Sequence, residues 1–493
     1  MQPENLNFGG GVADSAVSPI ALGVILLVGI LICVRPRTKV IGPFLAAGIL
    51  IPYDQVLVLG GVHFPMIRLL AVFGFVRLAR AKFSGKEKVF SGGMNGIDWA
   101  VIVLTLFITL DGVLLWQSTS QLVYQLGNIL AVFGVYFLLR YLIRDEADVK
   151  QALRTLAVVA FAVGLLMTYE HATGRNPYFA LLGGARPDFS TAIDRADAFR
   201  ARGVFAHPNL AGSFGGFILP LFVGWWGREK STRKWAGLGI IGALTIPIAT
   251  GSSTALFALI GGLIAFGLWP LRGKMKLIRW GIVATLGGLQ CVMKSPVWHI
   301  ISDVSLSQDS SSYHRYMLVD QCIRHFFTWA LIGTKDYGNW GWDMWDLSNQ
   351  YVGTADTAGL IPFIALLAIL VYGFKYVGRM RRVAEREGDK KLEFFVWALG
   401  ASLFGNVVAF MGISYFDQTI VPWYMVLAMI SAMTMAVWSR QAAAAKVGGA
   451  ERVELEAATV GMGFGSRPAF RPVRDARAGA GLQAVGNGSK RGQ

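Results

Sequence analysis

The sequence predicts an all-α fold: a polytopic membrane protein with about 12–13 transmembrane helices and a long, partly helical external loop between the tenth and eleventh spans. Of its 493 residues, 54% are hydrophobic and only 15% are charged, and the apolar runs are too many for a soluble core. Basic residues recur in alternate loops between these runs. These three observations together exclude an ordinary soluble protein.

The apolar runs give the order of the predicted spans. A span needs about 20 apolar residues, because roughly 30 Å of hydrocarbon is crossed at about 1.5 Å per residue. Thirteen runs approach that length, although several are short. They are 16–34, 40–60, 64–78, 97–116, 122–139, 152–169, 209–226, 235–250, 253–269, 280–293, 360–376, 392–411 and 420–438.

The placement of basic residues predicts the orientation. Most of the 46 Lys and Arg residues lie on one side, in the loops 35–39, 77–88, 140–154, 227–234, 271–279 and 375–391 and in the tail from 440. The positive-inside rule makes that side cytoplasmic, so the N-terminus faces out and the C-terminus faces the cytoplasm. The net charge of +16 therefore indicates anionic lipid rather than nucleic acid as a partner.

Two domains follow from this pattern. Residues 1–439 form the membrane domain, with external loops at about 170–208 and 294–356, and residues 440–493 form a disordered basic cytoplasmic tail. Three cysteines, two of them in spans, indicate no disulfide framework. The six histidines all lie on the outer side, which is where we expect any chemistry; they are His63, His171, His207, His299, His314 and His325.

The stretch RARGVFAHPNLAGSF, residues 200–214, leads from a polar loop into a span. Pro208 suits the first turn of a helix, because its fixed φ and missing N–H cost nothing there. Arg200 and Arg202 lie just before that helix, whose N-terminal dipole already favours an anion. The alternative is that both arginines extend to lipid phosphates.

The second external loop offers a similar set of side chains. Residues 310–340 place His314, Arg315, Arg324 and His325 among aromatic residues, and Asp343 and Asp346 follow. In one straight helix Arg315 and Arg324 would point to opposite sides at about 100° per residue, so either a bend brings one of them round to a shared ligand or one points elsewhere. The tryptophans here are also typical of a membrane-interface belt.

These motifs resemble the O-antigen ligase and polymerase family of integral membrane glycosyltransferases. The resemblance rests on RxxGxFxHPNLAG entering a span, on the hairpin around TGSSTALFALIGG, and on a long loop running from HRY through LIGT to SNQY, and it covers roughly residues 100–435. It implies a bacterial plasma-membrane protein with its active site between the outer loops and the membrane. It also implies an undecaprenyl-diphosphate-linked oligosaccharide donor, no metal and no cofactor.

The resemblance also assigns residues. It places the donor diphosphate on Arg202 and Arg315, and we extend this predicted diphosphate site to Arg200 and Arg324. The remaining substrate contacts are expected from residues of the same motifs, namely His207, Asn209, Ser348, Asn349 and Tyr351. The lipid bilayer and proteins of polysaccharide synthesis or export are the expected partners.

Two departures from the family favour a polymerase over a ligase. Ligases usually carry His-Asn where this chain has Ser348-Asn349, and many relatives place an arginine after the serine in the Gly251-Ser252-Ser253 hairpin. We therefore expect polymerisation of repeat units into an exopolysaccharide or O-antigen. The alternatives are a ligase that transfers glycan to a lipid A core or protein, and a polysaccharide flippase or transporter.

The acceptor hydroxyl needs a base within hydrogen-bond reach. The candidates are Asp346 and His314, and we prefer Asp346, two residues before the position where relatives carry histidine. The structural alternative is that Asp346 caps a short helix through Ser348 and Asn349.

Overall fold

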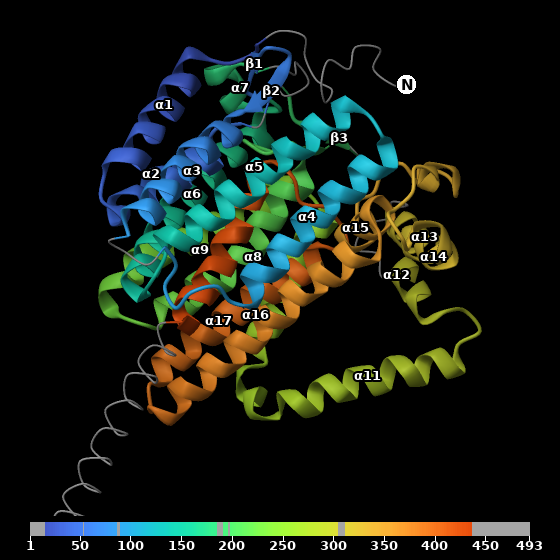
Figure 1. The fold of residues 1–493 in the computed structure, drawn as a ribbon. Helices are drawn as coiled ribbons and strands as arrows, with labels where there is room; N and C mark the ends of the chain where they lie inside the picture. The colour runs from blue at the N-terminus through green and yellow to red at the C-terminus, as the bar shows by residue number, and fades with distance from the viewer. Residues whose placement is uncertain are drawn as a thin grey trace, which may run out of the picture. The chain divides into compact units, whose positions relative to one another are not determined.

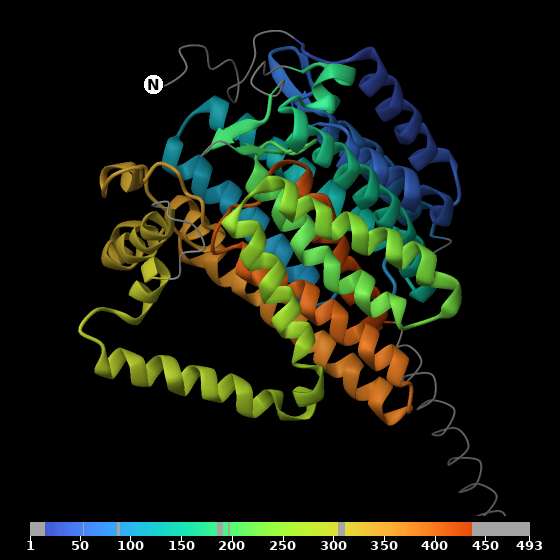
Figure 2. The ribbon, with the colours of Figure 1, turned by 180° about the vertical axis from the view of Figure 1, so that it is seen from behind.

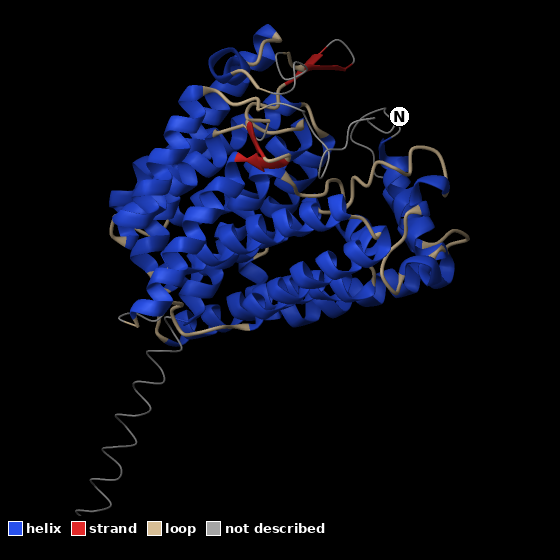
Figure 3. Cartoon of the chain, turned by 45° about the horizontal axis from the view of Figure 1, so that its top comes forward, coloured by secondary structure: helices blue, strands red, loops and turns tan. Residues whose placement is uncertain are grey.

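The computed structural model describes residues 15–435, except 53, 86–88, 185–190, 196–197 and 304–310. The predicted tail 440–493 lies outside the described residues. The described part is mostly helical, and its strands form two short hairpins (Figure 3). The predicted all-helical class is therefore confirmed, apart from these hairpins.

The elements follow one another along the chain as Figure 1 labels them. The first part contains α1 (Pro19–Val34), α2 (Arg37–Leu50), β1 (Val56–Leu59), β2 (Val62–Pro65), α3 (Met66–Ser84), α4 (Gly96–Trp116), α5 (Thr119–Leu142), α6 (Glu146–Thr173), α7 (Pro177–Leu182), β3 (Ile193–Arg195) and β4 (Ala198–Arg200). The middle part contains α8 (Pro208–Trp226), η2 (Lys230–Thr232), α9 (Arg233–Thr250), α10 (Ser253–Gly267), η3 (Trp269–Lys274) and α11 (Met275–Val292). The last part contains η4 (Val297–His299), α12 (Ile300–Asp303), α13 (Ser311–Arg324), α14 (Phe326–Trp329), η5 (Asp336–Asn339), α15 (Gln350–Ala358), α16 (Leu360–Arg386) and α17 (Lys390–Ala409). It ends with the final helical segment Asp417–Met435, whose first turn is η6 (Asp417–Thr419).

Each of the thirteen predicted spans contains a helix, but not all of these helices are long. Among the described residues, six helices are long and apolar enough to cross a membrane, or seven if α10 and the η3–α11 segment, bent by 72°, form one span. The predicted span 40–60 is wrong beyond Leu50. Pro52 disfavours helix at the residue before it, and Gly60 and Gly61, both at positive φ, turn the chain into the β1–β2 hairpin.

Helix α8 lies inside the bundle, between α9, α10 and α17 (Figure 2). Its glycines allow α10 and α17 to approach it closely. A Cβ at Gly212 or Gly216 would meet Ala255 or the backbone of α10, and one at Gly224 would meet Ala398 of α17. The final segment Asp417–Met435 is also almost entirely enclosed by protein. The motif at residues 200–214 therefore begins a helix of the protein interior rather than one that faces lipid.

Ion pairs gather the predicted basic loops at one end of the bundle. Arg228 in the α8–α9 loop pairs with Glu146 at the start of α6 and with Asp389 before α17. The nitrogen–oxygen distances are 3.0 and 2.8 Å. The other pairs are Arg37–Asp148, Lys150–Glu229, Arg272–Glu393 and Arg381–Glu393. The ion pairs thus confirm that the basic loops 35–39, 140–154, 227–234, 271–279 and 375–391 share an end. That this end is cytoplasmic stays a prediction.

Helix α11 extends away from the other helices in both views (Figures 1 and 2), and none of its residues is buried. The bend before it is held by Trp397, whose indole N–H donates to the carbonyls of Ala265 and Phe266, and by Arg272, which lies 4.1 Å from the Trp269 ring. Beyond α11, the predicted external loop is partly helical, as expected. It has a hydrophobic core of its own, which we call the loop core: Leu318, Cys322, Trp329, Met344, Val352 and Ala355.

Candidate active site

The site begins at the first turn of α8. Pro208 is the first helical residue, as predicted, and His207 is the N-cap, whose Nδ1 accepts the N–H of Asn209 at 3.1 Å. Burial, and then the positive charges of Arg200 and Arg202, lower the pKa of His207 from 6.5 to about 4. The imidazole is therefore neutral at pH 7, as an acceptor must be.

Arg200 joins α8 to the start of α10. Its guanidinium donates from Nε to the carbonyl of Thr250 at 3.1 Å and from Nη2 to Oδ1 of Asn209 at 3.0 Å. The Ser252 hydroxyl, which caps α10, donates to the same Asn209 oxygen at 2.6 Å. Arg200 is only 8% exposed, so it is turned into the protein and does not extend to lipid phosphates.

Arg202 is held differently. Its backbone N–H and that of Gly203 donate to the two carboxylate oxygens of Glu170, at 3.3 and 2.7 Å, and its Nη2 donates to the carbonyl of Thr191 at 3.2 Å. Gly203 has a φ of +58°, which glycine adopts without strain. Arg202 thus holds the loop beside His207, whereas Arg200 reaches the turn between α9 and α10, which we call the α10 turn.

Sequence analysis missed Glu170, which is fully buried in the last turn of α6. An acidic residue that closes an apolar run and opens a loop rich in arginine was the available signal. Because Glu170 lies under the backbone of residues 202–203, it shapes the arginine loop.

Arg315 approaches the same turn from the second of the two loops predicted to be external. Its Nη2 donates to the hydroxyl of Thr254 in the first turn of α10 at 2.8 Å, and that hydroxyl donates to the carbonyl of Gly412 at 3.3 Å. Helix α13 is continuous, so Arg324 lies on its opposite side, where its exposed guanidinium pairs with the buried carboxylate of Asp320 at 2.6 Å. The expected divergence of Arg315 and Arg324 is confirmed.

Asp346 lies close to Arg315 and His314. It follows the turn in which the carbonyl of Asp343 is 3.0 Å from Nε2 of His314. Although Asp346 is a surface residue, partial removal of its carboxyl from water raises its pKa above 3.8. His314 and Arg315 oppose that rise, and Asp343 adds to it. The two proposed bases and one diphosphate arginine are therefore neighbours.

The remaining predicted contacts have structural partners. Asn349, not Asp346, caps α15: its side chain accepts the N–H groups of Tyr351 and Val352 at 3.0 and 3.2 Å. The Tyr351 hydroxyl donates to the carbonyl of Val407 at 3.0 Å, and the Ser348 N–H donates to the carbonyl of Asp346 at 2.9 Å. The alternative role of Asp346 as a helix cap is thus wrong.

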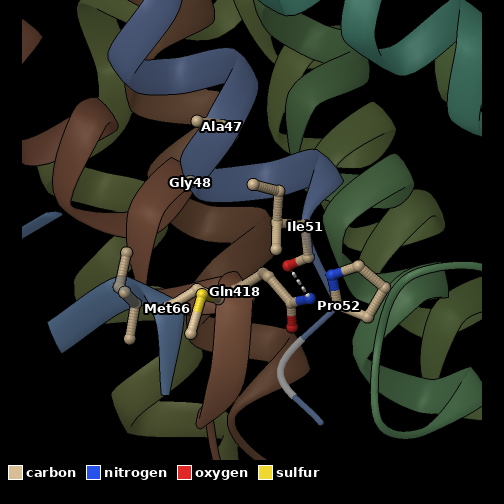
Figure 4. A pocket seen from close by; sticks show the side chains of 7 residues that line it. Ala47, Gly48, Ile51, Pro52, Met66 and Gln418 are labelled. Carbon is tan, nitrogen blue, oxygen red and sulfur yellow. Dashed lines mark hydrogen bonds between the residues drawn. The ribbon is translucent and has the colours of Figure 1, made fainter. Parts of the chain in front are cut away.

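A hollow elsewhere in the bundle is too small to compete with this site. It is lined by Ala47, Gly48, Ile51, Pro52, Met66, Ile67 and Gln418 (Figure 4). Within it the Gln418 amide donates to the carbonyl of Ile51 at 2.7 Å. It has space for about one water molecule, which excludes a sugar.

The geometry suits an anion with several oxygens. The N-termini of α8 and α10 are joined through Asn209 and Ser252, and Arg200 and Arg315 approach them from separate loops. Helix dipoles and guanidinium groups both favour negative charge at such a place. Within the described residues, no three His, Cys, Asp or Glu side chains gather as metal ligands. No protein-family model and no curated protein matches the sequence.

The lowered pKa of His207 predicts a pH-dependent stability. The neutral form is favoured in the folded state, so its contribution is complete above pH 6.5 and is lost as the pH falls toward 4, by about 3 kcal/mol in all. His207→Asn keeps an N-cap but removes the titration. Between pH 6.5 and 4 we expect the thermal midpoint of the wild type in nanodiscs to fall more steeply than that of the variant. Parallel curves would contradict a neutral, buried His207.

Proposed function

We propose that this protein polymerises undecaprenyl-diphosphate-linked oligosaccharide repeat units into an exported polysaccharide, an exopolysaccharide or O-antigen. The reaction is a metal-independent glycosyl transfer at the outer face of a bacterial plasma membrane. One observation carries the proposal: two arginines from different loops converge on the α9–α10 turn. Arg315 donates to Thr254 in the first turn of α10. Arg200 donates to the carbonyl of Thr250 at the end of α9 and to Asn209, which also accepts from the α10 cap Ser252.

The proposed chemistry assigns the diphosphate to this turn. Breaking the bond between the anomeric carbon and the diphosphate oxygen leaves negative charge on the phosphate, and prearranged cationic donors stabilise that charge. Arg200 and Arg315 supply the charge, and the N-termini of α8 and α10 add their dipoles. The undecaprenyl chain remains in the bilayer.

The acceptor sugar approaches from the side of the external loop. Its hydroxyl oxygen attacks the anomeric carbon while Asp346 takes the proton. Asp346 is exposed there and lies near Arg315, so base and leaving group meet on one side of the loop. His314, in contact with the carbonyl of Asp343, orients this turn.

The proposal includes an arrangement of the chain in the membrane. We propose that the thirteen apolar segments make thirteen crossings, with the short helices completing spans through the adjoining turns and α11 as a separate crossing. An odd number places the two termini on opposite sides. The end that holds Arg37, Arg228 and Arg272 is then cytoplasmic, and the site is outside.

Lipid-linked intermediates from a deletion strain test the function and separate it from the ligase alternative. A polymerase leaves single lipid-linked repeat units when it is removed, whereas a ligase leaves long lipid-linked polymer. Complementation with the wild-type chain should restore polymer. An unchanged pool of lipid-linked glycans would overturn both.

A further inference from the structure

Two tryptophans next to the proposed base are exposed to an unusual degree. Trp342 is 78% and Trp345 73% exposed, and neither ring stacks or hydrogen-bonds with another described residue. Trp340, in the same turn, instead stacks on His325 with ring centroids 4.2 Å apart. Large aromatic surfaces left open beside ordered ones are typical of binding surfaces.

The turn that carries them is anchored. Met344, between the two tryptophans, is 2% exposed in the loop core, so its neighbours in sequence are directed outward. Asp343 adopts a φ of +60°, which is unfavourable for a residue other than glycine, and its carbonyl contacts His314. The indoles are therefore held in place beside Asp346.

The side chains of this turn alternate in chemistry. Each tryptophan is directly followed by an aspartate: Asp343 follows Trp342, and Asp346 follows Trp345. A pyranose ring matches this pattern, because its C–H face packs on an indole and its hydroxyls donate to carboxylates. The turn thus offers both kinds of contact that a sugar needs.

We propose that Trp342 and Trp345 form a stacking platform for the sugar rings of the acceptor glycan, with Asp343 accepting from its hydroxyls. This inference rests on the proposed function. The platform holds the growing or incoming glycan so that its terminal hydroxyl meets Asp346. It therefore governs how well an acceptor is used, and with it the length of the product.

A lipid surface is the other occupant that exposed tryptophans can take. The two carboxylates disfavour it, because they are repelled by anionic headgroups. Phe327 and Leu331, exposed on the same loop at 93% and 81%, have no acidic residue between positions 321 and 335. They provide the matched apolar control.

The test compares ring shape with hydrophobicity in cells that make the native polysaccharide. Trp342→Leu with Trp345→Leu keeps apolar side chains but removes the flat rings, and Trp342→Tyr with Trp345→Tyr keeps rings. We expect the leucine pair to use acceptors about tenfold less well and to give much shorter polymer, because both stacked rings are lost. The tyrosine pair and Phe327→Leu should give near-normal lengths. Polymer length on gels and the amount of the protein in membranes are the measurements.

Each outcome has one meaning. Normal lengths in the leucine pair overturn the platform, and equal shortening in the leucine and tyrosine pairs overturns it as well. Arg315→Ala, run in parallel, separates this failure from that of the proposed function. If polymer persists in Arg315→Ala, the polymerase proposal fails; if it is lost there but unaffected in the tryptophan variants, only the platform fails.

Discussion

Alanine in place of Arg315 is expected to reduce glycan transfer by about 10²- to 10³-fold, because one prearranged donor to the leaving phosphate is lost. Arg315→Lys should recover only part of the activity, since an ammonium lacks the two-pronged geometry that matches a phosphate. Arg200→Lys should likewise retain only part of the activity, because Arg200 meets the same turn through Asn209. The measurement is transfer from lipid-linked repeat units by the purified full chain in nanodiscs.

Arg324→Ala is the matched control. It lies on the same helix as Arg315, on the opposite side and exposed, so transfer should remain normal. Arg202→Ala should act through stability instead, with less protein in the membrane, because Arg202 is only 3% exposed and holds its loop. Full activity in Arg315→Ala would remove the diphosphate site from this turn.

Asp346→Asn is expected to lower transfer by about 10²- to 10⁴-fold while donor binding persists. The amide keeps the shape of the carboxylate but cannot take a proton, and the arginines are untouched. Because the pKa of Asp346 is raised, wild-type activity should increase as the pH rises through that pKa and deprotonates the base. The variant should lack this limb of the pH profile.

The structure makes this substitution a clean test. Asn349 caps α15, so Asp346→Asn removes no helix cap. Asn349→Ala is the complementary control: it should cost about 1 kcal/mol of stability without changing the pH profile. Near-normal transfer by Asp346→Asn would contradict its role as the base and leave His314, the other candidate base.

Composition predicted the helices and the sorting of loops well, because both depend on local features. Runs of apolar residues predict the helices, and the basic loops predict which loops lie at the same end of the bundle. The failure at 51–60 is informative: the segment continues an apolar run, but α2 ends at Leu50, just before Pro52, and Gly60 and Gly61 form the turn of the β1–β2 hairpin. Apolar character alone does not distinguish a span from a hairpin that packs on the bundle.

The site was predicted in part. Helix periodicity separated Arg315 from Arg324, and Pro208 marked the start of α8. Periodicity could not show which of Arg200 and Arg202 reaches the α10 turn, because that depends on Glu170 from α6. The fully buried Arg140–Asp98 pair, at 2.8 Å, was missed for the same reason: its partners lie on separate helices.

The segment Asp417–Met435 is the last of the described helical segments to be synthesised, yet it occupies the interior of the bundle. Gln418 bonds the carbonyls of Ile51 and Val204, and Asp417 accepts the N–H of Ala206, next to the α8 cap. Until translation reaches these residues, the arginine loop has its contacts with Glu170 and Thr191 but lacks those with Asp417 and Gln418. This segment is the least hydrophobic of the six apolar helices, as suits one that enters an assembled bundle rather than lipid. The candidate active site therefore gains its contacts to Asp417 and Gln418 only after this last described helical segment has been synthesised.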